Sequence, residues 1–155
     1  EKASKKAEQY LREHEYSPVV PVNYDEYNNI SSITFAAFED DVIYYPRKVT
    51  VKIAMDNGEV LGIGAHDYVF EEKPASLPQP AMSMDEAAQL LHPSFKRSGS
   101  AKAFIKNDFD EKVMCYAFTG GVNGSIYRIF LNAETGEEEK VETLEPIEAA
   151  FKNKQ

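Results

Sequence analysis

Cysteine, long apolar runs and clustered basic residues are all scarce in this sequence of 155 residues. Cys115 is the one cysteine, so an intramolecular disulfide, a two-cysteine redox motif and an all-cysteine zinc site are excluded. No run approaches the roughly 20 apolar residues of a membrane-spanning helix, and no signal peptide is visible. Because the chain begins at Glu1 rather than Met, we expect a piece of a longer protein from which a signal or membrane anchor is missing.

Positive charge is limited as well, since 17 Lys and Arg residues face 26 Asp and Glu residues and give a formal net charge of −9. This charge repels nucleic acid and anionic membrane surfaces. We therefore expect no nucleic-acid binding, and membrane attachment only through an N-terminal anchor. The hydrophobic fraction of 43%, with nine Tyr and nine Phe, is sufficient for a core rich in aromatic side chains.

The first half of the chain has the pattern of one helix followed by short strands. Residues 1–15 place apolar side chains at helical spacing, and Pro18 and Pro21 then begin extended chain. Short β-rich runs follow from residue 19 to residue 70, and residues 49–55 alternate as a strand with one buried face does. Asn57-Gly58 predicts a hairpin next, because both residues tolerate positive φ.

The second half begins after a proline-rich segment. Residues 73–82 contain three prolines among small and polar residues, which predicts a linker. Ser83 and Glu86 have the spacing of a capping box, which predicts a short helix to about Leu91, ended by His92-Pro93. Antiparallel strands are then expected at residues 101–105, 112–118, 125–132 and 137–144.

The two halves look like copies of one unit. Residues 51–56 are similar to residues 127–132, and both stretches are followed by Gly and then Glu. We therefore predict an α+β protein of two tandem units, each a helix packed on a curved antiparallel sheet of three or four strands. The expected units are residues 1–72 and 83–145, joined by the linker at residues 73–82 and followed by a C-terminal helix or tail at residues 146–155.

Support for catalysis or metal binding is weak. His14, His66 and His92 lie far apart without the spacing of metal ligands, and Cys115 lies in an apolar run that disfavours a thiolate. Acidic groups fall at predicted turns, where carboxylates are solvated, at residues 39–41, 108–111 and 137–139. We expect no catalytic residue, no metal ion and no cofactor.

Aromatic side chains near the strands suggest protein recognition instead. Strand alternation turns either Tyr44 or Tyr45 outward, and likewise Ile126 or Tyr127, unless both faces of the sheet are covered. Exposed tyrosines suit protein recognition because they bury a large area at low entropic cost. Tyr44, Tyr45 and Tyr127 are the predicted protein-interface residues.

Several stretches of the chain resemble the YpeB family of spore germination proteins, with their PepSY repeats. They are SITFAAFEDDVIYYPRKVTVKIAMDNGEVLG at residues 32–62, VMCYAF at residues 113–118 and RIFLNAETGEEE at residues 128–139. The similarity spans about residues 7–144, whereas residues 146–155 depart from the usual family ending. It carries over no catalytic residues.

This resemblance implies a place and a partner. The place is extracytoplasmic, at the outer face of the spore inner membrane. The partner is a cortex-lytic enzyme of the SleB type, which the protein stabilises, localises or inhibits in the dormant spore. We expect strand edges and aromatic faces to bind this enzyme.

Two other functions remain open. A cell-wall glycan hydrolase could use Glu39 or Asp41 as acid, and it requires a deep pocket with two facing carboxylates. A small-ligand-binding extracytoplasmic domain requires an apolar cavity beneath the helix that carries Tyr10 and Leu11.

Overall fold

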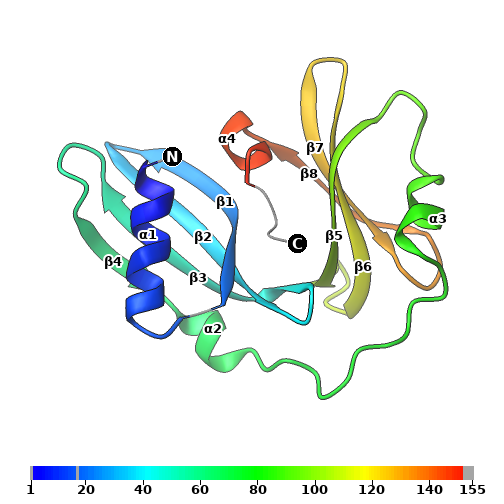
Figure 1. The fold of residues 1–155 in the computed structure, drawn as a ribbon, viewed down its shortest axis with the longest axis horizontal. Coiled ribbons are helices and arrows are strands. Elements are labelled where there is room, and N and C mark those ends of the chain that lie inside the picture. Colours follow the sequence, from blue (N-terminus) through cyan, green and yellow to red (C-terminus); the bar gives the residue numbers. More distant parts are fainter. Residues whose placement is uncertain (1, 17, 152–155) are drawn as a thin grey trace.

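Eight strands of this chain form one curved sheet with helices packed against it, in a computed structural model that describes residues 2–16 and 18–151 (Figure 1). The predicted α+β class is confirmed. The elements are, in order, α1 Lys2–Glu13, β1 Val19–Tyr27, β2 Ile30–Glu39, β3 Val42–Ala54, β4 Val60–Gly64, α2 His66–Phe70, α3 Met84–Ala88, β5 Lys96–Lys106, β6 Lys112–Val122, β7 Ser125–Asn132, β8 Glu138–Leu144 and α4 Pro146–Ala149. Within the described residues no helix is long and apolar enough to cross a membrane.

The sheet consists of two groups of strands, β1 to β4 and β5 to β8. Strands within each group pair antiparallel. A short parallel ladder between residues 42–44 of β3 and residues 102–104 of β5 joins the groups. Hydrophobic alternation does not specify which strands are neighbours, so the sequence did not indicate this ladder. The boundaries of the two units at residues 1–72 and 83–145 stay a prediction.

Helix α1 covers one face of the first group. Its Ala7 and Leu11 are fully buried and lie in one cluster with Phe35 of β2 and Val49 of β3. Burial of a leucine side chain stabilises a fold by roughly 1.5–3 kcal/mol, which makes Leu11 a main anchor of this helix. The helix was expected at residues 1–15; residue 1 lies outside the described residues, and the helix ends at Glu13.

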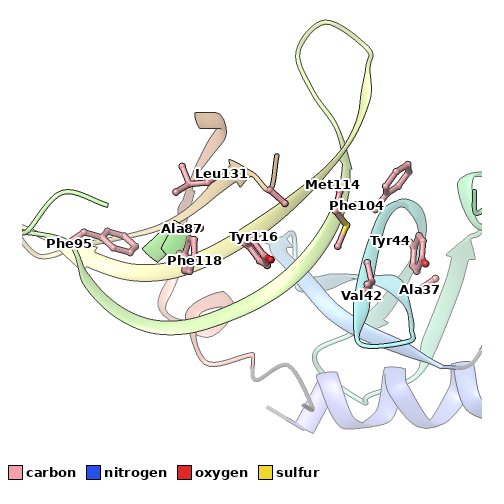
Figure 2. Packing of buried hydrophobic residues seen from close by; sticks show 11 residues of the cluster. Ala37, Val42, Tyr44, Ala87, Phe95, Phe104, Met114, Tyr116, Phe118 and Leu131 are labelled. Atoms are coloured by element: carbon pink, nitrogen blue, oxygen red, sulfur yellow. The ribbon is translucent and has the colours of Figure 1, made fainter. Parts of the chain in front are cut away.

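The second group has a larger aromatic cluster, in which Phe95, Tyr116 and Phe118 lie beside Ala87 of α3 (Figure 2). The predicted capping box is confirmed, because Ser83 Oγ accepts from Glu86 N at 3.1 Å and Glu86 Oε1 accepts from Ser83 N at 3.2 Å. Helix α3 nevertheless has only five residues and ends before the expected residue 91. The helix alone is therefore a small cover for this face.

The proline-rich segment completes that cover. Leu77 and Met82 pack against the same aromatic cluster. The Tyr116 hydroxyl donates a hydrogen bond to the Met82 carbonyl at 2.7 Å, and Ala81 N donates to the Ala133 carbonyl at 3.0 Å. The segment has no helix or strand between residues 71 and 80, but these contacts tie its end to β6 and to the residue after β7.

The turn after β3 and the turn after β7 have the same geometry. Gly58 N donates to the Ala54 carbonyl at 2.8 Å, and Gly136 N donates to the Asn132 carbonyl at 2.8 Å. The two glycines have φ angles of +73° and +78°, which glycine adopts without steric cost. Ala54 therefore corresponds to Asn132, two residues away from the correspondence expected from sequence. A shift of two residues keeps every side chain on its face of the sheet, so alternation could not detect it.

Three elements differ from the expectation. Helix α2 was not predicted, and β1 was expected only as extended chain. The run expected at residues 49–55 is the second part of a longer strand, β3, which begins at Val42 and continues through Pro46.

Side chains of β7 and α4 cover the outer edge of β1. Arg128 Nη2 donates to the Val22 carbonyl at 2.8 Å. The Glu148 Oε2 atom accepts from Tyr24 N at 3.0 Å and from Asn23 Nδ2 at 3.1 Å. Edge strands expose unpaired backbone groups, and these contacts satisfy two of them. We call Arg128 of β7 and Glu148 of α4 the edge clasp, because they connect the far end of the sheet to β1.

Candidate functional site

The three tyrosines predicted as interface residues lie in or beside the core. Tyr44 is 7% exposed, and its ring centroid lies 5.9 Å from that of Phe104. Tyr45 is half-buried on the other face of β3, and its ring meets that of Phe130 edge to face at 5.1 Å. Tyr127 is half-buried against the cluster that contains Tyr44. Both faces of the sheet are covered here, which is the exception that the alternation argument allowed; the binding role of these residues stays a prediction.

A bulge in β3 sets the direction of Tyr45. Ala37 pairs with Tyr44 and Ala36 pairs with Lys48, so residues 45–47 are inserted between two paired positions. Inserted residues bend a strand and redirect its side chains. The bulge also accommodates Pro46, whose missing N–H would interrupt a regular ladder.

A pocket of about 240 Å³ lies where the two groups of strands meet, and we call it the joint pocket. Tyr45 and Phe130 line it from β3 and β7, and its charged lining includes Asp67, Glu71 and Glu142. Elements far apart in the chain thus form one hollow. This pocket could not be predicted from the sequence, because it depends on the parallel ladder between β3 and β5.

A buried arginine stands beside this pocket. Arg128 is 5% exposed, and its Nη1 atom donates to Glu142 Oε1 at 3.0 Å. Its guanidinium carbon lies 5.7 Å from the centroid of the Tyr45 ring. Burial raises the pKa of Tyr45 to about 12, although Arg128 acts to lower it. The Tyr45 hydroxyl therefore stays protonated near neutral pH.

Each of these pocket carboxylates faces a cation. Glu142 pairs with Arg128, Asp67 lies 3.9 Å from the Lys48 ammonium, and Glu71 lies 3.2 Å from that of Lys112. The hydrogen bond from Lys112 lowers the pKa of Glu71. A general acid needs a raised pKa, so Glu71 is shifted in the wrong direction for that role.

The two acids nominated for hydrolysis lie elsewhere. Glu39 ends β2, where it pairs with Lys73, and Asp41 is exposed in the turn that follows. Neither lines the joint pocket. The two facing carboxylates that the hydrolase hypothesis requires are therefore not formed by these residues.

Cys115 is a core residue, as its apolar neighbours predict. It is fully buried, and burial, with a smaller effect of Glu139, raises the pKa of its thiol to about 12. The neutral thiol is a poor nucleophile. Across residues 2–16 and 18–151, no three His, Cys, Asp or Glu side chains gather as a metal site would require.

The space beneath α1 is filled by side chains. Ala7 and Leu11 are fully buried against the sheet. A separate open hollow of about 340 Å³ lies at the side of the helix, between Arg12, Tyr16 and Phe38. The apolar cavity required by the small-ligand hypothesis is thus not found under the Leu11 side chain.

Exposed apolar side chains lie on two neighbouring segments beside the joint pocket. Val69 and Phe70 of α2 are 62% and 69% exposed, and Phe109 in the turn between β5 and β6 is 83% exposed. Lys106 and Lys112 at the two ends of that turn both pair with Glu71, directly after α2. We call Val69, Phe70 and Phe109 the joint patch. Sequence reasoning missed it, although an aromatic residue between Asp108 and Asp110 in a predicted turn was a usable sign.

Comparison with known proteins gives one consistent family. Residues 1–78 match the family model described as YpeB sporulation, PepSY1 and PepSY2 domains. A sporulation protein YpeB of Halalkalibacterium halodurans is 37% identical over 149 residues, which are 96% of this chain and 33% of the relative. The Bacillus subtilis protein of the same name is 31% identical over 128 residues, 83% of this chain and 28% of the relative. The chain thus spans about a third of the length of these relatives.

A solved structure supports the same relationship. The Bacillus megaterium YpeB C-terminal domain superposes with a TM-score of 0.89 and 34% sequence identity. The match covers 93% of this chain and 64% of that domain. The arrangement of both groups of strands is therefore shared with that domain.

Proposed function

The chain belongs to the YpeB family of sporulation proteins, and on this premise we propose that it acts by binding another protein and catalyses no reaction itself. The partner is a cortex-lytic enzyme of the SleB type, which the chain stabilises, localises or inhibits in the dormant spore. The place of action is the outer face of the spore inner membrane, reached through an anchor outside this sequence.

The observation that carries the proposal is the exposure of aromatic rings at the joint patch. Phe70 and Phe109 are 69% and 83% exposed, whereas most other rings of the chain are buried or half-buried. Exposed aromatic side chains that gather at one place are typical of protein interfaces, where few residues supply most of the binding energy.

The ionisable groups of the interior support a role without catalysis. Burial raises the pKa values of Tyr44, Tyr45, Cys115 and Tyr116, which keeps these groups neutral. The pKa of Glu71 is lowered by Lys112, which keeps it ionised. Each shift therefore moves the group away from proton transfer or nucleophilic attack near neutral pH.

Two assays on the same purified chain test the proposal. The first measures binding to the cortex-lytic enzyme by calorimetry, and the second measures muropeptide release from spore cortex by the chain alone. We expect binding without release. Muropeptide release by the chain in the absence of the enzyme, or failure of the wild-type chain to bind, would contradict the proposal.

A further inference from the structure

The two segments that carry the joint patch are acidic. Residues 66–73 and 106–112 contain six carboxylates and three lysines. The lysines are already paired: Lys73 with Glu39, Lys106 with Glu71, and Lys112 with Glu71. Each lysine of these two segments is therefore already in an ion pair.

Three carboxylates beside the patch have no such cation. Glu72, Asp108 and Glu111 are exposed, and within the described residues none of them forms an ion pair. Glu72 lies two residues after Phe70, and Asp108 directly precedes Phe109. The exposed rings are thus accompanied by unpaired negative charge on both segments.

The turn that presents Phe109 is fixed by hydrogen bonds. Asn107 is 8% exposed, and its Oδ1 atom accepts from Phe109 N at 3.0 Å and from Glu111 N at 2.9 Å. Asn107 N donates to the Glu111 carbonyl at 2.8 Å. A ring held on an ordered turn loses little freedom on binding, which favours affinity.

We propose that the joint patch binds a protein surface in which an apolar recess is bordered by Lys and Arg side chains. The inference rests on the proposed function and specifies its interface. Phe70 and Phe109 supply the apolar contact, and Glu72 and Asp108 attract the basic border. A second copy of this chain is disfavoured as occupant, because it carries the same acidic segments and a net charge of −9.

The test uses the cortex-lytic enzyme as probe and starts with wild-type binding. We expect Phe70→Ser and Phe109→Ser each to weaken binding about tenfold or more. Leu90→Ser and Tyr27→Ser are matched controls, since these side chains are 58% and 74% exposed but lie beside α3 and at the end of β1. The controls are expected to bind as the wild type does, and circular dichroism confirms that each variant is folded.

Charge reversal tests the basic border independently. Glu72→Lys and Asp108→Lys are expected to weaken binding about three- to tenfold at low salt, mainly through slower association, with a smaller effect in 0.5 M salt. If the wild type binds but the Phe70 and Phe109 variants are unaffected, the docking surface is wrong while the proposed function stands. If the wild type does not bind, the proposed function itself fails. A concentration-dependent dimer that Phe109→Ser abolishes would identify a second copy as occupant and overturn the inference.

Discussion

In the first group of strands a twelve-residue helix covers the sheet, whereas in the second group a five-residue helix shares this task with the proline-rich segment. Leu11 of α1 is fully buried, and Ala87 is the one buried residue of α3. Leu77 and Met82, outside any helix, pack against the same cluster as Met84 of α3 does. Two groups of strands with similar turns can thus be covered by different parts of the chain.

Truncation of a leucine in each cover should give the largest difference between the groups. Leu11→Ala removes a fully buried side chain, so we expect the free energy of unfolding to fall by about 2–5 kcal/mol. Leu77→Ala, in the proline-rich segment, removes a half-buried side chain that packs against the second cluster, and we expect a smaller loss of about 1–2 kcal/mol. Urea unfolding of both variants measures these values. Equal losses would show that the two covers contribute alike.

The edge clasp connects the two groups of strands, which have separate covers. Its loss should have the next largest effect on the free energy of unfolding. Glu148 is 7% exposed and accepts hydrogen bonds from Asn23, from Tyr24 N and from Glu145 N. Glu148→Ala leaves the Tyr24 N–H without this acceptor, and we expect the free energy of unfolding to fall by about 1–3 kcal/mol. Hydrogen exchange at Tyr24 should become faster than in the wild type.

The control for the clasp is Glu138→Ala, which removes an exposed carboxylate at the start of β8. We expect its free energy of unfolding to stay within about 0.5 kcal/mol of the wild-type value. Unchanged exchange at Tyr24 in Glu148→Ala would argue against a clasp between the ends of the sheet.

Alkaline pH should lower the stability of the fold through Cys115, which lies in β6 of the second group. Burial raises the pKa of this thiol to about 12, whereas an unfolded thiol titrates near about 8.5. Because the folded pKa is the higher one, the stabilisation is complete below about pH 8.5 and is lost as the pH rises toward about 12. Between pH 7 and pH 10 we expect the free energy of unfolding to fall by about 2 kcal/mol less in Cys115→Ala than in the wild type.

Urea unfolding at both pH values in the presence of a reductant measures this difference. Tyr45→Phe serves as the comparison, because an unfolded tyrosine titrates near about pH 10 and its effect should begin later. Parallel pH curves for the wild type and Cys115→Ala would contradict the burial of the thiol.

Local features of this fold were predictable from the sequence, and its long-range features were not. The capping box at Ser83 and the hairpin at Gly58 depend on neighbouring residues, so the pattern predicted them correctly. The position of Tyr45 depends on the bulge in β3 and on the second group of strands, whose Phe130 packs against the Tyr45 ring. The joint patch likewise depends on α2 and the β5–β6 turn being neighbours, and no periodicity within either segment encodes that.

The turns after β3 and β7 allow the finest comparison, because their glycines have the same backbone geometry but different surroundings. Gly58→Ala and Gly136→Ala both place a Cβ atom on a residue with positive φ, at a cost of about 1 kcal/mol each. The added Cβ at Gly58 would lie 3.5 Å from Lys6 Nζ, whereas at Gly136 it would lie 2.6 Å from Leu90 Cδ1. Since Leu90 is 58% exposed, its side chain can turn away, so we expect Gly136→Ala to cost at most about 0.5 kcal/mol more. Combining Gly136→Ala with Leu90→Ala should remove most of that excess in urea unfolding, and an excess that persists would point to Met82, whose Cε atom would lie 3.3 Å from the added Cβ.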